Sequence, residues 1–125
     1  MTEKHLSEMK LLNREIALDK SHLASLEAQL RHYKNEEISS RIRSLKAKIE
    51  AKIKHSLALY DEINDFIMSI DDALIRLIIA LRFINSLTWE QIALHIGGNN
   101  TADGVRKLYK RYAKRCLDKS DDITN

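Results

Sequence analysis

Cationic side chains at helical spacing stand near the end of the sequence and are its most informative chemical feature. Between Thr101 and Lys119 there are seven lysines and arginines against two aspartates. A helix would gather most of these cations on one face: Arg106, Lys107, Lys110, Arg111 and Lys114. Such side chains can hold the phosphates of a nucleic acid, and arginine and lysine can also donate to O6 and N7 of guanine. The pattern therefore predicts a contact with nucleic acid.

Residues for catalysis or metal binding show no comparable pattern. The sequence has no glycine-rich phosphate loop, no nucleophile motif and no pair of carboxylates in an apolar setting. Its five histidines are scattered and have no cysteines beside them, so we expect no zinc site. The single cysteine, Cys116, cannot form an intramolecular disulfide, which fits a reducing compartment, and we interpret it as a small apolar packing residue. We expect no enzymatic activity and no cofactor.

All three glycines lie in one short stretch, at positions 97, 98 and 104, in a chain that has no proline. The first two begin a Gly-Gly-Asn-Asn sequence, which is typical of a tight turn. The residue that follows a helix often needs a positive φ, which glycine adopts without steric cost. Ala93 lies four residues before Gly97 and is small enough to let a second helix come close. The glycines therefore mark the place where two helices are expected to join sharply.

Capping residues predict the helix before this turn. Thr88, with Gln91 three residues later, has the spacing of a capping box, and the helix is expected to run from Trp89 to Ile96. A helix, a tight turn and a second helix make a helix-turn-helix unit, in which the second helix enters the major groove of DNA.

The second helix is expected to start at Asn100 or Thr101, either of which can cap it, and to run to about Leu117. Apolar residues at three- and four-residue steps predict one buried stripe along it: Val105, Leu108, Tyr109, Tyr112 and Cys116. The cations then fall on the opposite face. Gly104 lies inside the first turn, where glycine costs about 1 kcal/mol relative to alanine. We expect it to allow the close approach of the neighbouring helix or, alternatively, of a DNA backbone.

These assignments define the candidate DNA-contacting residues. Five side chains of the second helix are expected nearest the bases: Thr101, Asp103, Arg106, Lys107 and Lys110. Arg111 and Lys114 are expected nearer the phosphates. Thr88 and Gln91 are expected to contact phosphate, because they stand at a helix N-terminus, which attracts anions. We interpret Trp89 as a core anchor rather than a stacking residue.

An apolar segment precedes this unit. Residues Ala73 to Ile84 are expected to form a helix that is buried on most sides, although two arginines interrupt it. Ser69 with Asp72 has the capping-box spacing, and Asp71 is an alternative cap. No apolar run is long enough to cross a membrane and no signal peptide is recognisable, so we expect a cytoplasmic location.

Two long amphipathic helices are expected before position 69. The first covers 3–34, with an apolar series at Met9, Leu12, Ile16, Leu23, Leu26, Leu30 and Tyr33. The second series restarts five residues later, at Ile38, Ile42, Leu45, Ile49, Ile53, Leu57, Tyr60, Ile63, Ile67 and Ile70. A continuous coiled coil does not absorb a gap of five, so we place a turn over 35–40 and predict an antiparallel, coiled-coil-like hairpin. One uninterrupted rod that dimerises along its length is the alternative.

The predicted hairpin has two polar features. Asp19 interrupts the first apolar series, and it either sets the register, faces a partner or is a solvated outlier. A cationic run contains only one acidic residue, Glu50: Arg41, Arg43, Lys46, Lys48, Lys52 and Lys54. We interpret this run as solvated surface, with an extension of the DNA contact as the alternative. Because two helices alone bury little apolar surface, we expect a homo-oligomer, most simply a dimer, through these helices.

The predicted fold class is therefore all-α. Residues 1–68 form a helical hairpin for oligomerisation or for binding a partner, and residues 69–119 form the helix-turn-helix unit. Residues 120–125 are expected to be an acidic, flexible tail.

The stretch from Ala73 to Arg115 resembles region 4 of bacterial sigma factors. The matching parts are Leu-Arg-Phe-Ile at 81–84, Leu-Thr-Trp-Glu-Gln-Ile-Ala at 87–93 and Val-Arg at 105–106. The whole chain is similar to small sigma-region-4-like regulators of phages of Gram-positive bacteria, which include the RinA/ArpU-type activators of late genes. The resemblance implies binding to double-stranded DNA, control of phage genes in a bacterial host cell, and RNA polymerase as a further partner. The segment 97–105 is longer than in most such units, so base contacts transfer best to Arg106, Lys107 and Lys110.

The sequence thus predicts a sequence-specific transcription regulator that binds double-stranded DNA. Two alternatives of other classes remain open. One is a phage DNA-packaging protein of the small-terminase kind, which also joins a helix-turn-helix to an oligomerising helical part. The other is an inhibitor that binds a host protein through the hairpin.

Overall fold

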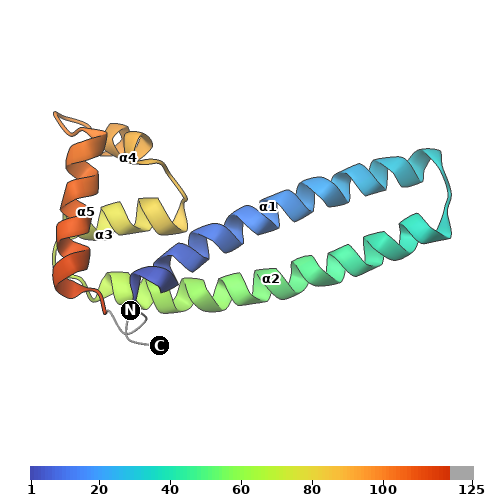
Figure 1. Ribbon diagram of the computed structural model, residues 1–125, viewed down its shortest axis with the longest axis horizontal. Helices are drawn as coiled ribbons and strands as arrows, with labels where there is room; N and C mark the ends of the chain where they lie inside the picture. Colours follow the sequence, from blue (N-terminus) through green and yellow to red (C-terminus); the bar gives the residue numbers. More distant parts are fainter. Residues whose placement is uncertain (119–125) are drawn as a thin grey trace. The chain divides into compact units, whose positions relative to one another are not determined.

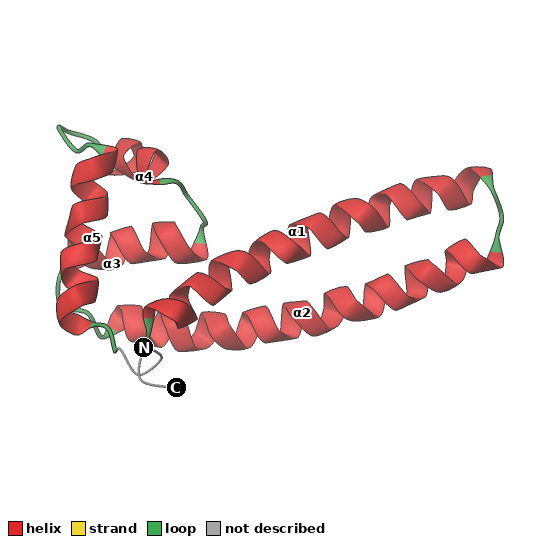
Figure 2. Cartoon of the chain, in the orientation of Figure 1, coloured by secondary structure: helices red, strands yellow, loops and turns green. Residues whose placement is uncertain are grey.

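The computed structural model describes residues 1–118, and every regular element among them is helical. The elements follow in the order α1 (Glu3–His32), α2 (Glu36–Met68), α3 (Ala73–Ile79), the π-helix η1 (Ala80–Ile84), α4 (Trp89–Ile96) and α5 (Ala102–Cys116) (Figure 1). Short loops join them (Figure 2). The expected all-α class is confirmed. The acidic tail expected over 120–125 lies outside the described residues.

The chain divides into two compact units. The hairpin unit is Leu11–Ala58, and the C-terminal unit combines residues 1–10 with the chain from Leu59 onward. This division differs from the expected boundary after residue 68. The first turns of α1 and the last turns of α2 belong with α3, α4 and α5.

In the hairpin unit, α1 and α2 run side by side in opposite directions (Figure 1). The chain reverses over 33–35, slightly before the expected turn at 35–40, and the side chain of Asn35 accepts the amide of Glu37 at 2.8 Å. Farther along, the Ser56 hydroxyl donates to Asn13 at 3.0 Å, which pairs the two helices across the unit. The structure therefore has two separate helices, and the alternative of one continuous rod is wrong.

Aliphatic side chains fill the apolar face of each hairpin helix, but the expected series needs two corrections. Tyr33 is 71% exposed, because α1 ends before it and it lies in the reversal. On α2, Leu57 and Tyr60 are also exposed, at 59% and 39%, whereas Leu59 is 5% exposed. At this point of α2, Ser56 faces α1 and bonds to Asn13, and Leu59, three residues farther on, lies on the same face.

Asp19, which interrupts the apolar series of α1, faces α2 and has a partner there. Its carboxylate accepts from Lys52 at 2.6 Å, and Glu15 lies 3.7 Å from the same ammonium. The hydrogen bond to Asp19, followed by the charges of both carboxylates, raises the pKa of Lys52 above its ordinary value of 10.5. A shift of register would separate this pair, so it favours the observed alignment of the two helices.

In the C-terminal unit, α3 begins at Asp72, whose side chain accepts the amides of Leu74 and Ile75. The expected capping box from Ser69 is wrong, and Asp71 is not the cap. The reason is that α2 continues to Met68, so Ser69 belongs to its end and donates to the carbonyl of Phe66 at 2.6 Å.

The apolar segment that follows Asp72 forms α3 and then the wider turn of η1. Five of its side chains are buried: Ile75, Ile78, Ile79, Leu81 and Phe83. Leu74 and Leu77 are 37% and 38% exposed, so the segment is less enclosed than expected. In η1 the amide of Asn85 bonds to the carbonyl of Ala80, five residues earlier, at 3.1 Å.

The first residues of the chain pack into this same unit. Leu6 and Met9 are 0% and 4% exposed, and the Tyr109 hydroxyl of α5 donates to the carboxylate of Glu3 at 3.0 Å. The amide of Asp118 donates to the carbonyl of Met1 at 2.9 Å. The start of α1 is therefore a structural part of the unit that contains α4 and α5.

Leu6→Ala is expected to destabilise the C-terminal unit by about 2–5 kcal/mol, because it leaves a cavity beside fully buried neighbours. Trp89 is the only tryptophan and lies in this unit, so its fluorescence during urea unfolding reports on it. The control is Lys4→Ala on the same helix and in the same unit, an exposed position at which a change below about 0.5 kcal/mol is expected. A wild-type midpoint for Leu6→Ala would contradict the assignment of this segment to the core.

Candidate nucleic-acid interface

The helix α4 begins with the capping box that the sequence predicted. The Thr88 hydroxyl accepts the amide of Gln91 at 3.1 Å, and the Gln91 side-chain oxygen accepts the amide of Thr88 at 2.9 Å. Both residues are exposed. The hydroxyl proton of Thr88 and the side-chain NH₂ of Gln91 remain able to donate to an anion outside the helix.

The turn after α4 has the backbone conformation that its glycines permit. Gly97 ends the helix with φ 78° and ψ −165°, and its amide bonds to the carbonyl of Ala93 at 3.0 Å. Gly98 also has a positive φ, of 67°. The side chain of Asn100 closes the turn by donating to the carbonyl of Gly97 at 2.8 Å. Ala93 is buried, and α4 packs against α5 as the small side chain predicted.

The helix α5 is capped by Thr101, the second of the two expected candidates. The Thr101 hydroxyl accepts the amide of Gly104 at 3.0 Å. A Cβ atom added to Gly104 would lie 3.1 Å from this hydroxyl, and no described atom of another helix lies within 4 Å of it. The expectation that Gly104 admits the neighbouring helix is therefore wrong, because the tight contact is with its own cap.

One face of α5 packs into the unit. Val105, Tyr109 and Tyr112 are 0%, 2% and 9% exposed, as the apolar stripe predicted, and Leu108 is half-buried. Cys116 is exposed, so its interpretation as a packing residue is wrong. The helix ends at Cys116, the backbone becomes extended at Leu117, and Leu117 is buried in its place.

The opposite face of α5 presents the predicted site residues to solvent. Thr101, Asp103, Lys107, Lys110, Arg111 and Lys114 are exposed, and Arg106 is half-buried. Among residues 1–118, Lys110, Arg111 and Lys114 have no carboxylate within ion-pair distance. The structure thus brings six of the nine predicted residues onto α5 and makes Thr101 its N-cap, while Thr88 and Gln91 stand at the start of α4.

Asp103 joins two of these cations. Its carboxylate accepts from Arg106 at 2.7 Å and from Lys107 at 2.9 Å. The hydrogen bond from Arg106, and then the one from Lys107, lower the pKa of Asp103 below its ordinary value of 3.8. Because such exposed ion pairs are weak, either cation can leave Asp103 for a phosphate or a base. The three side chains together keep one positive charge.

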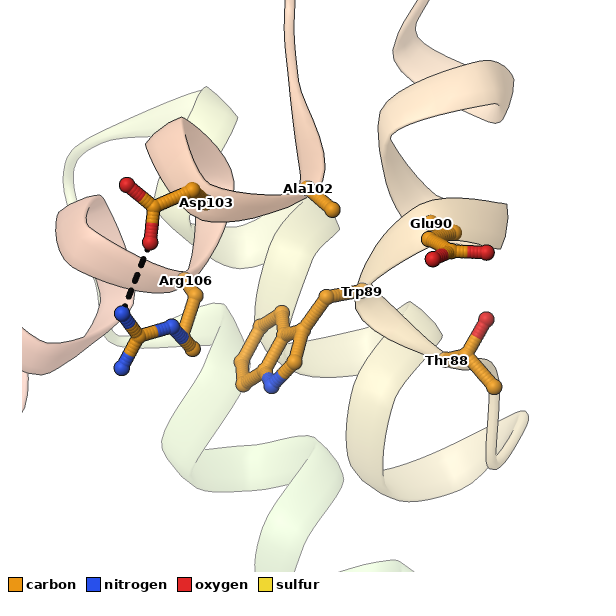
Figure 3. Close-up of a pocket in the computed structure, with 6 residues that line it drawn as sticks. All are labelled: Thr88, Trp89, Glu90, Ala102, Asp103 and Arg106. Atoms are coloured by element: carbon orange, nitrogen blue, oxygen red, sulfur yellow. Dashed lines mark hydrogen bonds and ion pairs between the residues drawn. The ribbon is translucent and has the colours of Figure 1, made fainter.

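A shallow pocket of about 430 Å³ lies between the first turns of α4 and α5. Its lining residues are Thr88, Trp89, Glu90, Ala102, Asp103 and Arg106. Figure 3 shows the Trp89 side chain extending from the start of α4, with Arg106 beside it and Asp103 joined to Arg106. The pocket therefore connects the capping residues of α4 with the cations of α5.

Trp89 packs on the interior and also lines this pocket. Its ring centroid lies 5.6 Å from that of Tyr109, and the Arg82 guanidinium stands over the ring at 4.4 Å. Arg82 also donates to the carbonyl of Leu87 at 3.0 Å. Sequence reasoning did not assign Arg82 a role, although an arginine inside an apolar run is a signal that it has a specific partner.

Comparisons with models of known protein families, with curated proteins and with solved structures find no match. Within the described part of the chain, no helix combines the length and the apolar character that a membrane span requires. Nor do three His, Cys, Asp or Glu side chains within residues 1–118 gather closely enough to hold a metal ion. A functional proposal accordingly depends on the residues of the interface and their arrangement.

Gly97→Ala should destabilise the C-terminal unit by about 1–3 kcal/mol, because the backbone region that Gly97 occupies is open almost only to glycine. Urea unfolding followed by Trp89 fluorescence measures the change. The control is Asn99→Ala in the same turn, an exposed position at which a change within about 0.5 kcal/mol is expected. Equal stabilities for the two variants would show that the turn does not need glycine at position 97.

Proposed function

We propose that the chain is a sequence-specific transcription regulator that binds double-stranded DNA and inserts α5 into the major groove. One observation carries the proposal: α5 has a buried apolar face and an exposed cationic face, and it directly follows a short helix and a tight turn. In helix-turn-helix proteins the second helix occupies the groove, while residues at the start of the first helix reach the DNA backbone.

The side chains suit distinct roles on a duplex. Arg106, Lys107 and Lys110 donate to base edges, where arginine in particular can bond to O6 and N7 of guanine. Asp103 can accept from N4 of cytosine, and Thr101 can contact either kind of base. The remaining cations, Arg111 and Lys114, and the caps of α4, Thr88 and Gln91, hold phosphates and so fix the position of α5.

The pairing of Asp103 with two cations is compatible with this role. It holds Arg106 and Lys107 near the start of α5 before DNA binds, which limits the rotamer freedom lost on binding. Binding then replaces weak, solvated pairs by contacts with the duplex.

The resemblance to sigma region 4 supports a more specific proposal. The chain would be encoded by a phage or prophage, act in the cytoplasm of a bacterial host and have RNA polymerase as a further partner. The parts that carry this resemblance form η1, α4 and α5.

The double substitution Arg106→Ala/Lys107→Ala is expected to abolish site-specific DNA retention, because each lost base contact costs about 1–3 kcal/mol. Duplexes selected from a random pool by the wild-type protein serve as the probe, and fluorescence anisotropy measures binding. Arg115→Ala, which removes an exposed cation from the same helix outside the proposed site, is the control and should bind like wild type. Wild-type binding by the double variant would refute the recognition-helix assignment, provided that circular dichroism shows unchanged helicity.

We also propose that two copies of the chain associate through the hairpin unit. Leu11 and Leu18 are 56% and 72% exposed and lie two helical turns apart on one face of α1. Apolar side chains of this size on an outer helix face gain free energy when a second copy covers them.

Leu11→Glu/Leu18→Glu should convert the proposed dimer into a monomer, because dimer formation would bury two carboxylates. Light scattering coupled to size exclusion measures the mass. Leu94→Glu, at an 82% exposed leucine of α4, is the control and should leave the mass unchanged. A monomeric wild-type protein would refute the dimer, and ring-sized oligomers would favour the DNA-packaging alternative.

A further inference from the structure

The net positive charge of the chain lies in the hairpin unit. Residues 11–58 contain ten lysines and arginines and six aspartates and glutamates, a formal charge of +4. The rest of the chain contains eleven and twelve, a formal charge of −1, which accounts for the total of +3. The unit that contains the cationic face of α5 is therefore not the more positive of the two.

Internal ion pairs neutralise only part of the hairpin charge. Arg41 pairs with Glu37 and Arg43 pairs with Glu36, each at 2.9 Å and near the start of α2. Lys48 is exposed and has no carboxylate within ion-pair distance among the described residues. Lys46 and Lys54 are likewise exposed and have no carboxylate within ion-pair distance among the described residues. The surface of α2 thus presents several cations that can bind an external anion.

A groove between α1 and α2 gathers three basic side chains. It has a volume of about 300 Å³ and is lined by His22, Leu26, Arg41, Ser44, Leu45 and Lys48. The polar residues of α2 in this set are three and four residues apart, which places them on one face of the helix. No carboxylate lines the groove. A second groove of the hairpin, beside Arg31 and Lys46, does contain a carboxylate, that of Glu27.

The chemistry of the first groove fits a phosphodiester. Arginine presents a planar pair of donors to two phosphate oxygens, lysine adds a point charge, and a serine hydroxyl adds a third donor. These groups carry no preference for one base over another. We propose that the groove at His22, Arg41, Ser44 and Lys48 binds the DNA backbone independently of base sequence. The inference takes from the proposed function only that the ligand is DNA. It does not require that α5 is the helix that contacts the bases.

DNA is favoured over an acidic protein because the chain presents cations on both of its units. A duplex carries a uniform line of negative charge, so the same ligand suits the cations of either unit, in any base sequence. A folded acidic protein would need two matching patches.

The test compares two doubly substituted proteins with equal loss of charge. Arg41→Gln/Lys48→Gln removes the groove cations. Arg43→Gln/Lys54→Gln is the matched control, because it too removes one glutamate-paired arginine and one unpaired, exposed lysine of α2, both outside the groove. Binding of the full chain to a duplex without a selected site is measured by fluorescence anisotropy over a range of salt concentrations. For the groove variant, the slope of log affinity against log salt should fall by about 2, and affinity near 0.1 M salt should fall about tenfold.

The control variant should lose less than about twofold in affinity. Equal losses in the two variants would overturn the inference, because they would indicate diffuse attraction rather than a groove. Wild-type DNA binding by both variants would also overturn it, and this is the result expected if the groove serves an acidic protein. The single variants Arg41→Gln and Lys48→Gln, each expected to lower the slope by about 1, replace the double variant if it does not fold.

A third variant separates this inference from the proposed function. Lys110→Gln/Arg111→Gln removes two cations of α5 and is measured on both selected and unselected duplexes. If it alone loses binding, the role of α5 stands and the groove inference falls. If only the groove variant loses binding, the groove stands and the role of α5 falls. A wild-type protein that binds no duplex at low salt would overturn both.

Discussion

The contacts of Tyr109 hold the C-terminal unit together. Its ring lies 5.4 Å from that of Phe83 in η1 and 5.6 Å from that of Trp89 in α4, and its hydroxyl donates to Glu3 at the start of α1. Burial, and then the nearby carboxylate of Glu3, raise the pKa of Tyr109, so the phenol stays protonated and remains a donor. One residue of α5 thus fixes that helix against three other elements. Because the buried face of α5 is held this firmly, the direction of its cationic face is determined as well.

The two units obtain their stability in different ways, and this affects the surfaces that they present. The aromatic cluster of Phe83, Trp89 and Tyr109 lies in the C-terminal unit. The hairpin unit depends on aliphatic side chains and on polar pairs such as Asp19 with Lys52. A two-helix layer has little interior, so many of its side chains remain at the surface whatever their type. Its grooves are shallow for the same reason, and they suit extended ligands better than small enclosed ones.

The sequence predicted those features of the structure that depend on residues close together along the chain. The capping box of Thr88 and Gln91 and the positive φ of Gly97 are set within three or four residues, and both were predicted. The stripe around Tyr109 also predicted which way the cations of α5 point. Contacts between distant segments had no such signal: Ser56 of α2 faces Asn13 of α1, and Leu59 rather than Leu57 is buried. The bond between Glu3 and Tyr109 and the position of Arg82 over Trp89 likewise emerge only from the folded chain.

The wide turn of η1 makes the C-terminal unit sensitive to the deletion of a single residue. Such a deletion would rotate the side chains that follow it, which no substitution does. A π turn holds one residue more than an α turn, and each helical residue rotates the following side chains by about 100°. A chain that has lost Ala80 or Leu81 could return to regular α-helix before Arg82. Arg82 would then swing away from Trp89, although no residue of α4 or α5 had changed. Deletions here could therefore alter the support beneath Trp89 in one evolutionary step, and an alignment of such variants would need a gap inside a helix.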